Sequence, residues 1–245
     1  MYDVKPHIAA TAQVPNIDAY RSRYHASLGD SDAFWLAEAK ARLQWSREPA
    51  QASQGGYDKL DFTWFADGRL NATVQCLDRH LATQPDKTAI IWAKDDAGAY
   101  EHISYADLHE RVCRMANVLL AQGVRRGDRV CLYLPMVPEL AVAMLACARI
   151  GAIHSIVFAG FSAAALRDRI IDAQCAVVIT ADQGLRGGRT IPLKETTDAA
   201  VDQCPCVARV LVVERTGADI AMDATRDLWL APLLDAVDAD CPPAI

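Results

Sequence analysis

The stretch MLACARIGAIHSIVFAGFS (144–162) leads from the end of one helix through a strand to the start of another helix. Gly151 ends the first helix, and the run 154–157 is typical of a short buried strand. A turn follows at 158–161, and Ser162 is a residue type that caps the next helix. A strand that ends in a glycine-containing turn and opens a helix is typical of the edge at which doubly wound sheets bind ligands. The stretch therefore predicts an α/β fold with a candidate site directly after the strand.

The same alternation of strand and helix continues on both sides of this stretch. A helix opens at Ser104, with Asp107 placed as in a capping box, and its apolar residues recur on one face. Short helical connections between strands require parallel strands with helices on both faces of the sheet. We therefore predict the α/β class, with a mainly parallel doubly wound sheet and flanking helices. The predicted strands lie at 129–134, 154–157, 176–180 and 208–213, and the predicted helices between them lie at 139–149, 164–174 and 193–201.

The amino-terminal part of the chain shows no such alternation. Residues 1 to about 30 are polar, and we expect them to be irregular. Helices are predicted at 32–45 and 76–83. We therefore expect residues 1–86 to form a helical and loop extension that wraps a main domain at 87–245.

The two ends of the main domain carry further predictions. Apolar runs at 89–93 and 100–103 flank a turn, so they predict a β-hairpin. After Arg215 the pattern is looser, with one helix expected at 227–237. The chain ends in Cys-Pro-Pro-Ala-Ile, and we expect it to be part of a longer protein.

The composition is that of a chain with a large core and no sign of a polyanionic partner. It has 245 residues, of which 52% are hydrophobic, and a net charge of −6, so nucleic acid and anionic membranes are not favoured as partners. No apolar run approaches the roughly 20 residues that a membrane span needs, and the first residues lack a signal core. Eight cysteines without a CxxC pair favour free thiols in a cytoplasmic protein. Cys204 and Cys206 form the only close pair, and no His or second pair lies near them in sequence.

Two loops hold the residues that could bind a ligand: the turn 158–161 and DQGLRGGRTIP (182–192). Both follow predicted parallel strands, so we expect them at the same edge of the sheet. Their glycines let a ligand approach the backbone closely, and their arginines carry guanidinium groups suited to phosphate. A phenyl ring offers a flat face for a base, and the following helix N-terminus adds N–H donors. Together these features predict a nucleotide site with an extra phosphate. The candidate ligand-binding residues are Phe158, Gly160, Arg186, Gly187, Gly188 and Arg189.

Each of these features also has a purely structural interpretation. An Arg-Gly-Gly-Arg turn is often only a solvated loop, and the spacing by itself favours that interpretation. His154 lies in an apolar strand, which is more typical of a hydrogen-bonded core histidine than of a catalytic base. Asp78, Arg79 and His80 are neighbours on one helix and point in different directions, so we interpret them as structural. No GxGxxG, Walker, GxSxG or HExxH motif is present. We identify no catalytic acid, base or nucleophile and no metal ligands.

Several stretches resemble the acetyl-CoA synthetases, a branch of the adenylate-forming acyl-CoA ligases. LNATVQCLDRHL (70–81), the run 126–162 and RGGRTIPLK (186–194) match that family in order and spacing. DAFWLAEA (32–39) resembles the family's N-terminal helix, so the resemblance covers nearly the whole chain. It implies the N-terminal part of the large domain of an enzyme that converts ATP, acetate and CoA to acetyl-CoA, AMP and pyrophosphate through acetyl-AMP.

The resemblance also implies where ligands bind. The family residues that hold the adenine and 3′-phosphate end of CoA match Phe158, Gly160, Arg186 and Arg189. Ala159 is a departure, because many members have a second glycine there. The family's ATP phosphate loop, carboxylate pocket and catalytic lysine are expected after Ile245. The ATP and Mg²⁺ sites are therefore expected outside this chain, which alone is expected to be inactive. A propionate or other short-chain acyl-CoA ligase and a non-catalytic binding or interaction module stay open as alternatives.

Overall fold

The computed structural model describes residues 5–245, and contacts within the chain divide it into two compact units. The division falls after Leu70, so the second unit begins at Asn71. The second unit contains the α/β sheet. No helix in the described part of the chain is long and apolar enough to cross a membrane.

The first unit is mainly helical and buries little apolar surface. Among its described residues, Ala39 and Ala52 are the only hydrophobic ones that are buried. Its elements are α1 (Pro6–Ala9), α2 (Ile17–Gly29), α3 (Ser31–Arg42) and the antiparallel strands β1 (Ser53–Gln54) and β2 (Thr63–Trp64).

The helix α2 corrects the expectation that residues 1 to about 30 are irregular; residues 1–4 of that range lie outside the described part. It begins after Asn16, whose side-chain oxygen accepts a hydrogen bond of 2.8 Å from the N–H of Ala19. None of its residues is buried. A prediction from apolar periodicity misses such a helix, because its signals are a cap and intrinsic helix propensity rather than an apolar face.

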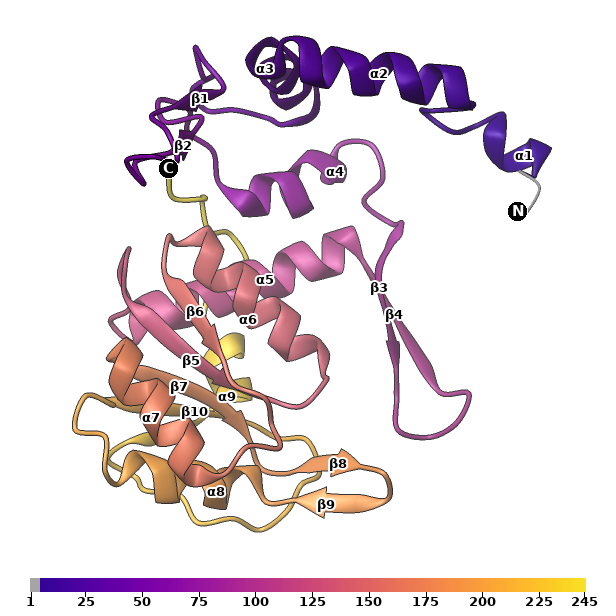
Figure 1. Cartoon of the computed structure of the whole chain (residues 1–245). Coiled ribbons are helices and arrows are strands. Elements are labelled where there is room, and N and C mark those ends of the chain that lie inside the picture. Colours follow the sequence, from indigo (N-terminus) through magenta and orange to yellow (C-terminus); the bar gives the residue numbers. More distant parts are fainter. Residues whose placement is uncertain (1–4) are drawn as a thin grey trace. The chain divides into compact units, whose positions relative to one another are not determined.

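A five-stranded parallel sheet forms the centre of the second unit (Figure 1). All neighbouring strands in it are parallel, and β7 is buried along its whole length. Such burial is expected where helices cover both faces of a parallel sheet. The structure therefore confirms the predicted fold class. In spatial order the strands are β11 (Asp227–Trp229), β10 (Arg209–Val213), β7 (Val177–Ala181), β5 (Arg129–Tyr133) and β6 (Ile153–Ile156).

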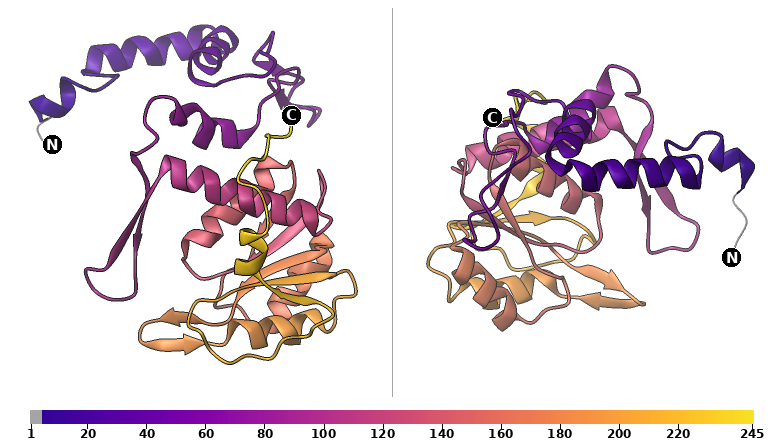
Figure 2. Two further views of the ribbon diagram at one scale, coloured as in Figure 1. Left: turned by 180° about the vertical axis from the view of Figure 1, so that it is seen from behind. Right: turned by 45° about the horizontal axis from the view of Figure 1, so that its top comes forward.

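The helices form one layer on each face of this sheet (Figures 1 and 2). The chain moves from β5 outward to β6 and then back past β5 to β7. Because crossovers between parallel strands are right-handed, the helix before this reversal and the helices after it lie on opposite faces. One layer contains α5 (Tyr105–Ala121), α6 (Pro138–Arg149) and the short α9 (Leu230–Asp235), and the other contains α7 (Ala163–Ala173) and α8 (Leu193–Val201).

The helix α5 has the capping box and the apolar face that the sequence predicts. The Asp107 N–H donates to the Ser104 hydroxyl at 3.1 Å, and the Asp107 carboxylate accepts from the Ser104 N–H at 3.3 Å. The residues predicted to form its apolar face are all buried: Leu108, Val112, Met115 and Leu119.

Residues 71–86 belong to the second unit, although the sequence grouped them with the extension. The Asn71 amide donates to the carbonyl oxygen of Arg149 at 3.0 Å. The Arg149 guanidinium donates in turn to both oxygens of the Asp78 carboxylate, at 2.9 and 3.0 Å. These buried polar contacts join the segment to α6, which is why the unit begins before residue 87. How residues 1–70 lie on the second unit stays a prediction. The segment contains the π-helical turn η1 (Val74–Asp78) and α4 (Arg79–Leu81).

Two local predictions have different outcomes. The hairpin is confirmed, because β3 (Thr88–Ala93) pairs antiparallel with β4 (Tyr100–Ser104). The helix predicted at 227–237 is wrong at its start, where the chain forms β11, and the helix covers only Leu230–Asp235. Asp227 to Trp229 pair with β10 and extend the parallel sheet. A run this short does not distinguish a buried strand from a helix by periodicity.

Candidate functional site

The carboxyl edge of the sheet has a topological switch point between β5 and β7. The connection after β5 leads through α6 to β6 on one side, and the connection after β7 leads through α8 to β10 on the other side. In doubly wound folds, ligands bind in the crevice at such a point. A cavity of about 380 Å³ lies here. It is lined by the loops after β5, β6 and β7 and by the hairpin β3–β4.

The turn after β6 is held in one shape by backbone and side-chain hydrogen bonds. The Phe161 N–H donates to the Phe158 carbonyl oxygen at 2.9 Å, and the buried Tyr133 hydroxyl donates to the Phe161 carbonyl oxygen at 2.8 Å. Burial raises the pKa of Tyr133, which further favours the neutral form of a hydroxyl that is already protonated near pH 7. A Cβ on Gly160 would lie 2.6 Å from a carbon of the Phe158 ring, so any other residue there would displace the ring. The turn therefore presents the Phe158 ring to the cavity with 53% of the residue exposed.

The second predicted loop is a hairpin rather than an irregular loop. Strand β8 (Gly184–Arg186) pairs antiparallel with β9 (Arg189–Ile191). Gly187 and Gly188 join them with φ values of +56° and +73°. A two-residue hairpin turn of this kind needs positive φ at both central positions, which glycine adopts without strain. The Gly-Gly pair between two short runs was the signal that could have predicted this hairpin.

The structure brings three of the six candidate residues together at the cavity. The guanidinium carbon of Arg186 lies 5.1 Å from the centroid of the Phe158 ring, and both side chains line the cavity with Gly160. Arg189 is the cross-strand partner of Arg186 at the exposed end of the hairpin, beside the two turn glycines, and does not line the cavity. Within residues 5–245, neither arginine forms an ion pair with a carboxylate. The end of the hairpin therefore carries two adjacent uncompensated positive charges.

Asp182 anchors the first strand of this hairpin to the loop after β10. Its carboxylate is buried and accepts hydrogen bonds from the N–H groups of Arg215, Thr216 and Gly217 at 2.8, 2.9 and 2.9 Å. Burial raises the pKa of Asp182, but these backbone donors outweigh it and hold the pKa below its ordinary value. The Asp182 carbonyl oxygen also accepts from the N–H of Lys194 at 3.2 Å, which closes the base of the hairpin.

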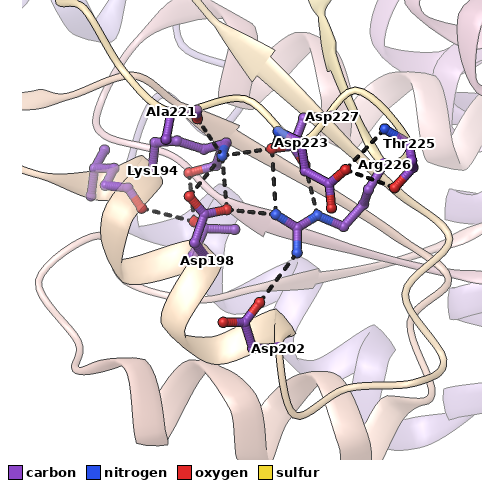
Figure 3. A network of polar contacts seen from close by, with 11 residues as sticks. Lys194, Asp198, Asp202, Ala221, Asp223, Thr225, Arg226 and Asp227 are labelled. Atoms are coloured by element: carbon purple, nitrogen blue, oxygen red, sulfur yellow. Dashed lines mark hydrogen bonds and ion pairs between the residues drawn. The ribbon is translucent and has the colours of Figure 1, made fainter.

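Lys194, at the start of α8, is the centre of a buried ionic network at the same base (Figure 3). Its ammonium group contacts both oxygens of Asp198 at 2.7 and 2.8 Å, an oxygen of Asp227 at 2.7 Å and the Ala221 carbonyl oxygen at 2.9 Å. Arg226 adds contacts of 2.7 Å to each of the two carboxylates. The network joins α8 to β11 through buried ion pairs, so the hairpin β8–β9 is connected to a firmly held part of the unit.

We expect the free energy of unfolding to fall in acid because of Asp182 and Asp227. Both carboxyl groups have pKa values in the folded state below the ordinary value of 3.8. A lowered folded-state pKa contributes stability above the unfolded-state value, and this contribution is lost as the pH falls through the folded-state pKa. Urea unfolding between pH 6 and pH 2.5 should show the loss beginning near pH 4. Asp182→Asn should make the curve less steep over that range, and an unchanged slope would contradict the assignment.

Sequence reasoning missed the opposite wall of the cavity, which contains Trp92 and Arg215. The Arg215 guanidinium carbon lies 5.0 Å from the centroid of the Trp92 ring, and the guanidinium pairs with Asp95. The Trp92 indole N–H donates to the Met136 carbonyl oxygen at 3.0 Å. Arg215 follows a parallel strand as the two predicted loops do, and that position was the available signal. Trp92 had no such signal, because it lies on the hairpin outside the strand–helix alternation.

His154 and the cysteines, which the sequence analysis also considered, form no part of the candidate site. His154 is half-buried on the edge strand β6 and does not line the cavity. The cysteines are free thiols. Across the described residues, no cluster of three or more His, Cys, Asp or Glu side chains could hold a metal ion.

Comparison with known proteins identifies the family to which the chain belongs. Residues 77–240 match the model of the AMP-binding enzymes. The chain belongs to the AMP-binding enzyme family. Residues 20–76 match a second model, that of the acetyl-coenzyme A synthetase N-terminus.

Individual relatives point to the same branch of the AMP-binding enzymes. The chain is 50% identical, over 99% of its length, to an acetyl-coenzyme A synthetase of Saccharophagus degradans, and 51% identical over the same share to one of Halorhodospira halophila. An acetoacetyl-CoA synthetase structure from Streptomyces lividans superposes with a TM-score of 0.83 at 27% identity, over 97% of this chain and 36% of that one. These findings confirm the resemblance to acetyl-CoA synthetases. The chain spans only about 38% of the length of the two curated relatives.

Proposed function

We propose that this chain supplies the CoA nucleotide site of an acetate–CoA ligase. The observation that carries the proposal is the Arg186 guanidinium over the Phe158 ring at the switch point, with Arg189 as its cross-strand neighbour, in a chain about half identical to acetyl-CoA synthetases. The whole enzyme would join acetate and ATP to acetyl-AMP and pyrophosphate. The CoA thiol would then displace AMP and give acetyl-CoA.

The candidate residues fit the adenosine 3′-phosphate end of CoA. Guanidinium groups bind phosphate through paired charge-assisted hydrogen bonds, so Arg186 and Arg189 are assigned to the 3′-phosphate and diphosphate. The Phe158 ring and Gly160 are assigned to the adenine, and the turn glycines 187–188 leave the backbone open to the phosphates. ATP and Mg²⁺ are assigned to the rest of the ligase. We expect such an enzyme to act on small molecules in the cytoplasm.

The proposal predicts a clear difference between this chain and a ligase of family length that contains it. The chain alone should give only background acetate-dependent ATP–pyrophosphate exchange, because it spans about 38% of its relatives. The longer ligase should catalyse this exchange and should then form acetyl-CoA when CoA is added. Propionate in place of acetate is the matched control for the acyl group.

Three results would contradict parts of this account. Robust exchange by the purified 245-residue chain would mean that it contains an adenylation site. Faster exchange with propionate than with acetate would assign the enzyme to a propionate ligase. Failure of the longer protein to activate any short carboxylic acid would identify a non-catalytic binding module.

A further inference from the structure

The cavity at the switch point has two walls that are built in the same way. On one wall the Arg186 guanidinium lies over the Phe158 ring at 5.1 Å, and on the other the Arg215 guanidinium lies over the Trp92 ring at 5.0 Å. All four side chains line the same cavity of about 380 Å³. The first wall comes from the loops after β6 and β7, and the second comes from the hairpin β3–β4 and the loop after β10. Figure 1 shows the hairpins β3–β4 and β8–β9 projecting from the same side of the second unit.

The two walls differ in charge. Arg215 forms an ion pair with Asp95, so its positive charge is balanced. Arg186 forms no ion pair within residues 5–245, and its cross-strand partner Arg189 is also a cation. A second cation lies at the Trp92 ring, because the Lys94 ammonium is 5.1 Å from the ring centroid, but it does not line the cavity and it pairs with Glu101 at 3.5 Å. Both cations at the second wall are therefore balanced by carboxylates, and an anionic group is attracted to the first wall.

The second wall is also held rigidly before any ligand binds. The Trp92 indole is fixed by its hydrogen bond of 3.0 Å to the Met136 carbonyl oxygen. The backbone of Arg215 is fixed by its hydrogen bond of 2.8 Å to the buried Asp182 carboxylate. A surface whose parts are already immobilised loses little conformational entropy when a ligand binds to it.

We propose that Trp92 and Arg215 form a base-recognising wall and are specificity-determining residues of this site. The adenine ring, assigned on one side to Phe158 and Gly160, packs on its other side against the Arg215–Trp92 stack, and its attached phosphates lie toward Arg186 and Arg189. Stacking on an aromatic ring or on a guanidinium plane is a general means of binding a nucleotide base, and preferences among bases come from the strength of the stack. The larger face of a purine should therefore be favoured over a pyrimidine. The proposal rests on the assignment of the cavity to the CoA nucleotide and adds to it the two residues that favour a purine such as adenine.

The test is calorimetric titration of the chain with three ligands: CoA, dephospho-CoA and a CoA analogue in which uracil replaces adenine. Trp92→Leu keeps an apolar side chain but removes the stacking face. It should raise the Kd for CoA by roughly five- to a hundredfold, the range measured for loss of one base–aromatic stack. It should also abolish most of the preference for adenine over uracil and leave the preference for CoA over dephospho-CoA unchanged. Trp92→Phe, which retains an aromatic face, should restore the preference for adenine.

A matched control lies next to Trp92 on the same strand. Side chains of neighbouring strand residues point to opposite faces, and Ile91 is 61% exposed and does not line the cavity. Ile91→Ala should therefore bind all three ligands as the unchanged chain does. Arg215→Gln repeats the test with no substitution in the hairpin itself, which covers the case in which Trp92→Leu fails to fold.

The outcomes separate this inference from the proposed function. One outcome is that Arg189→Ala loses the preference for CoA over dephospho-CoA while Trp92→Leu and Arg215→Gln keep the preference for adenine. That outcome would support the CoA nucleotide site and contradict the role of Trp92 and Arg215 in base recognition. If none of the three variants changes the binding of any ligand, the result contradicts both the CoA nucleotide site and the role of Trp92 and Arg215 in base recognition.

Discussion

Replacing Arg189 with alanine should raise the KM for CoA by roughly ten- to a hundredfold in a ligase of family length that contains this chain. Hydrogen bonds that involve a charged group contribute about 1.5–3 kcal/mol each, and a tenfold change in affinity corresponds to about 1.4 kcal/mol. Arg189 is one of two adjacent cations at the end of the hairpin β8–β9. The first half-reaction should stay nearly intact, since neither ATP nor acetate is assigned to this hairpin.

A comparison of CoA with dephospho-CoA as substrates tests more directly whether Arg189 recognises the 3′-phosphate. If the arginine recognises the 3′-phosphate, Arg189→Ala should lose most of the preference for CoA over dephospho-CoA. Arg169→Ala is a matched control, because Arg169 is an exposed arginine on α7 outside the cavity. An unchanged preference in Arg189→Ala, or an equal loss in the adenylation step, would mean that the hairpin is only a solvated turn.

Replacing Lys194 with methionine should lower the free energy of unfolding by about 3–5 kcal/mol. The Lys194 ammonium is buried and contacts the Asp227 carboxylate at 2.7 Å, and the Asp227 side chain has no exposed surface. Methionine fills a similar volume but leaves that carboxylate without one of its two cations, and the desolvation cost is then uncompensated. Urea unfolding followed by circular dichroism measures the change.

Two further variants test the cause of this loss. Lys87→Met removes an exposed lysine and should change the free energy of unfolding by less than about 0.5 kcal/mol. The double variant with Lys194→Met and Asp227→Leu no longer has the uncompensated carboxylate. Its free energy of unfolding should therefore be higher than that of Lys194→Met alone. A loss below about 1 kcal/mol in Lys194→Met would show that Arg226 alone compensates Asp227.

The sheet could be predicted from the sequence because local signals agree with the tertiary structure there. The predicted strand 154–157, bounded by Gly151 and Ser162, overlaps β6 (Ile153–Ile156) and leads through a turn into α7. The Ser162 hydroxyl caps α7 by accepting from the Ala165 N–H at 3.3 Å. By contrast, α2 has no apolar face and β11 has three residues, so neither produces a periodic signal.

The site could be predicted only in part, for a physical reason. Phe158 and Arg186 follow parallel strands, and topology alone brings such residues to one edge of the sheet. Trp92 reaches the same cavity from a hairpin that precedes the alternation, and Arg215 is placed by its contacts with Asp95 and Asp182. Those contacts join residues far apart in sequence, and no local pattern encodes them.

The most direct test of the CoA nucleotide site is to titrate the ¹⁵N-labelled chain with adenosine 3′,5′-bisphosphate and follow the amide signals by NMR. The account predicts that the largest shifts come from residues 158–160 and 184–190 and from the Trp92 indole N–H. The chain has a second cavity, of about 370 Å³, lined by residues of α5, α6 and α9. Shifts that cluster there, or an absence of shifts in the two loops at millimolar ligand, would contradict the assignment of the switch-point cavity to the CoA nucleotide.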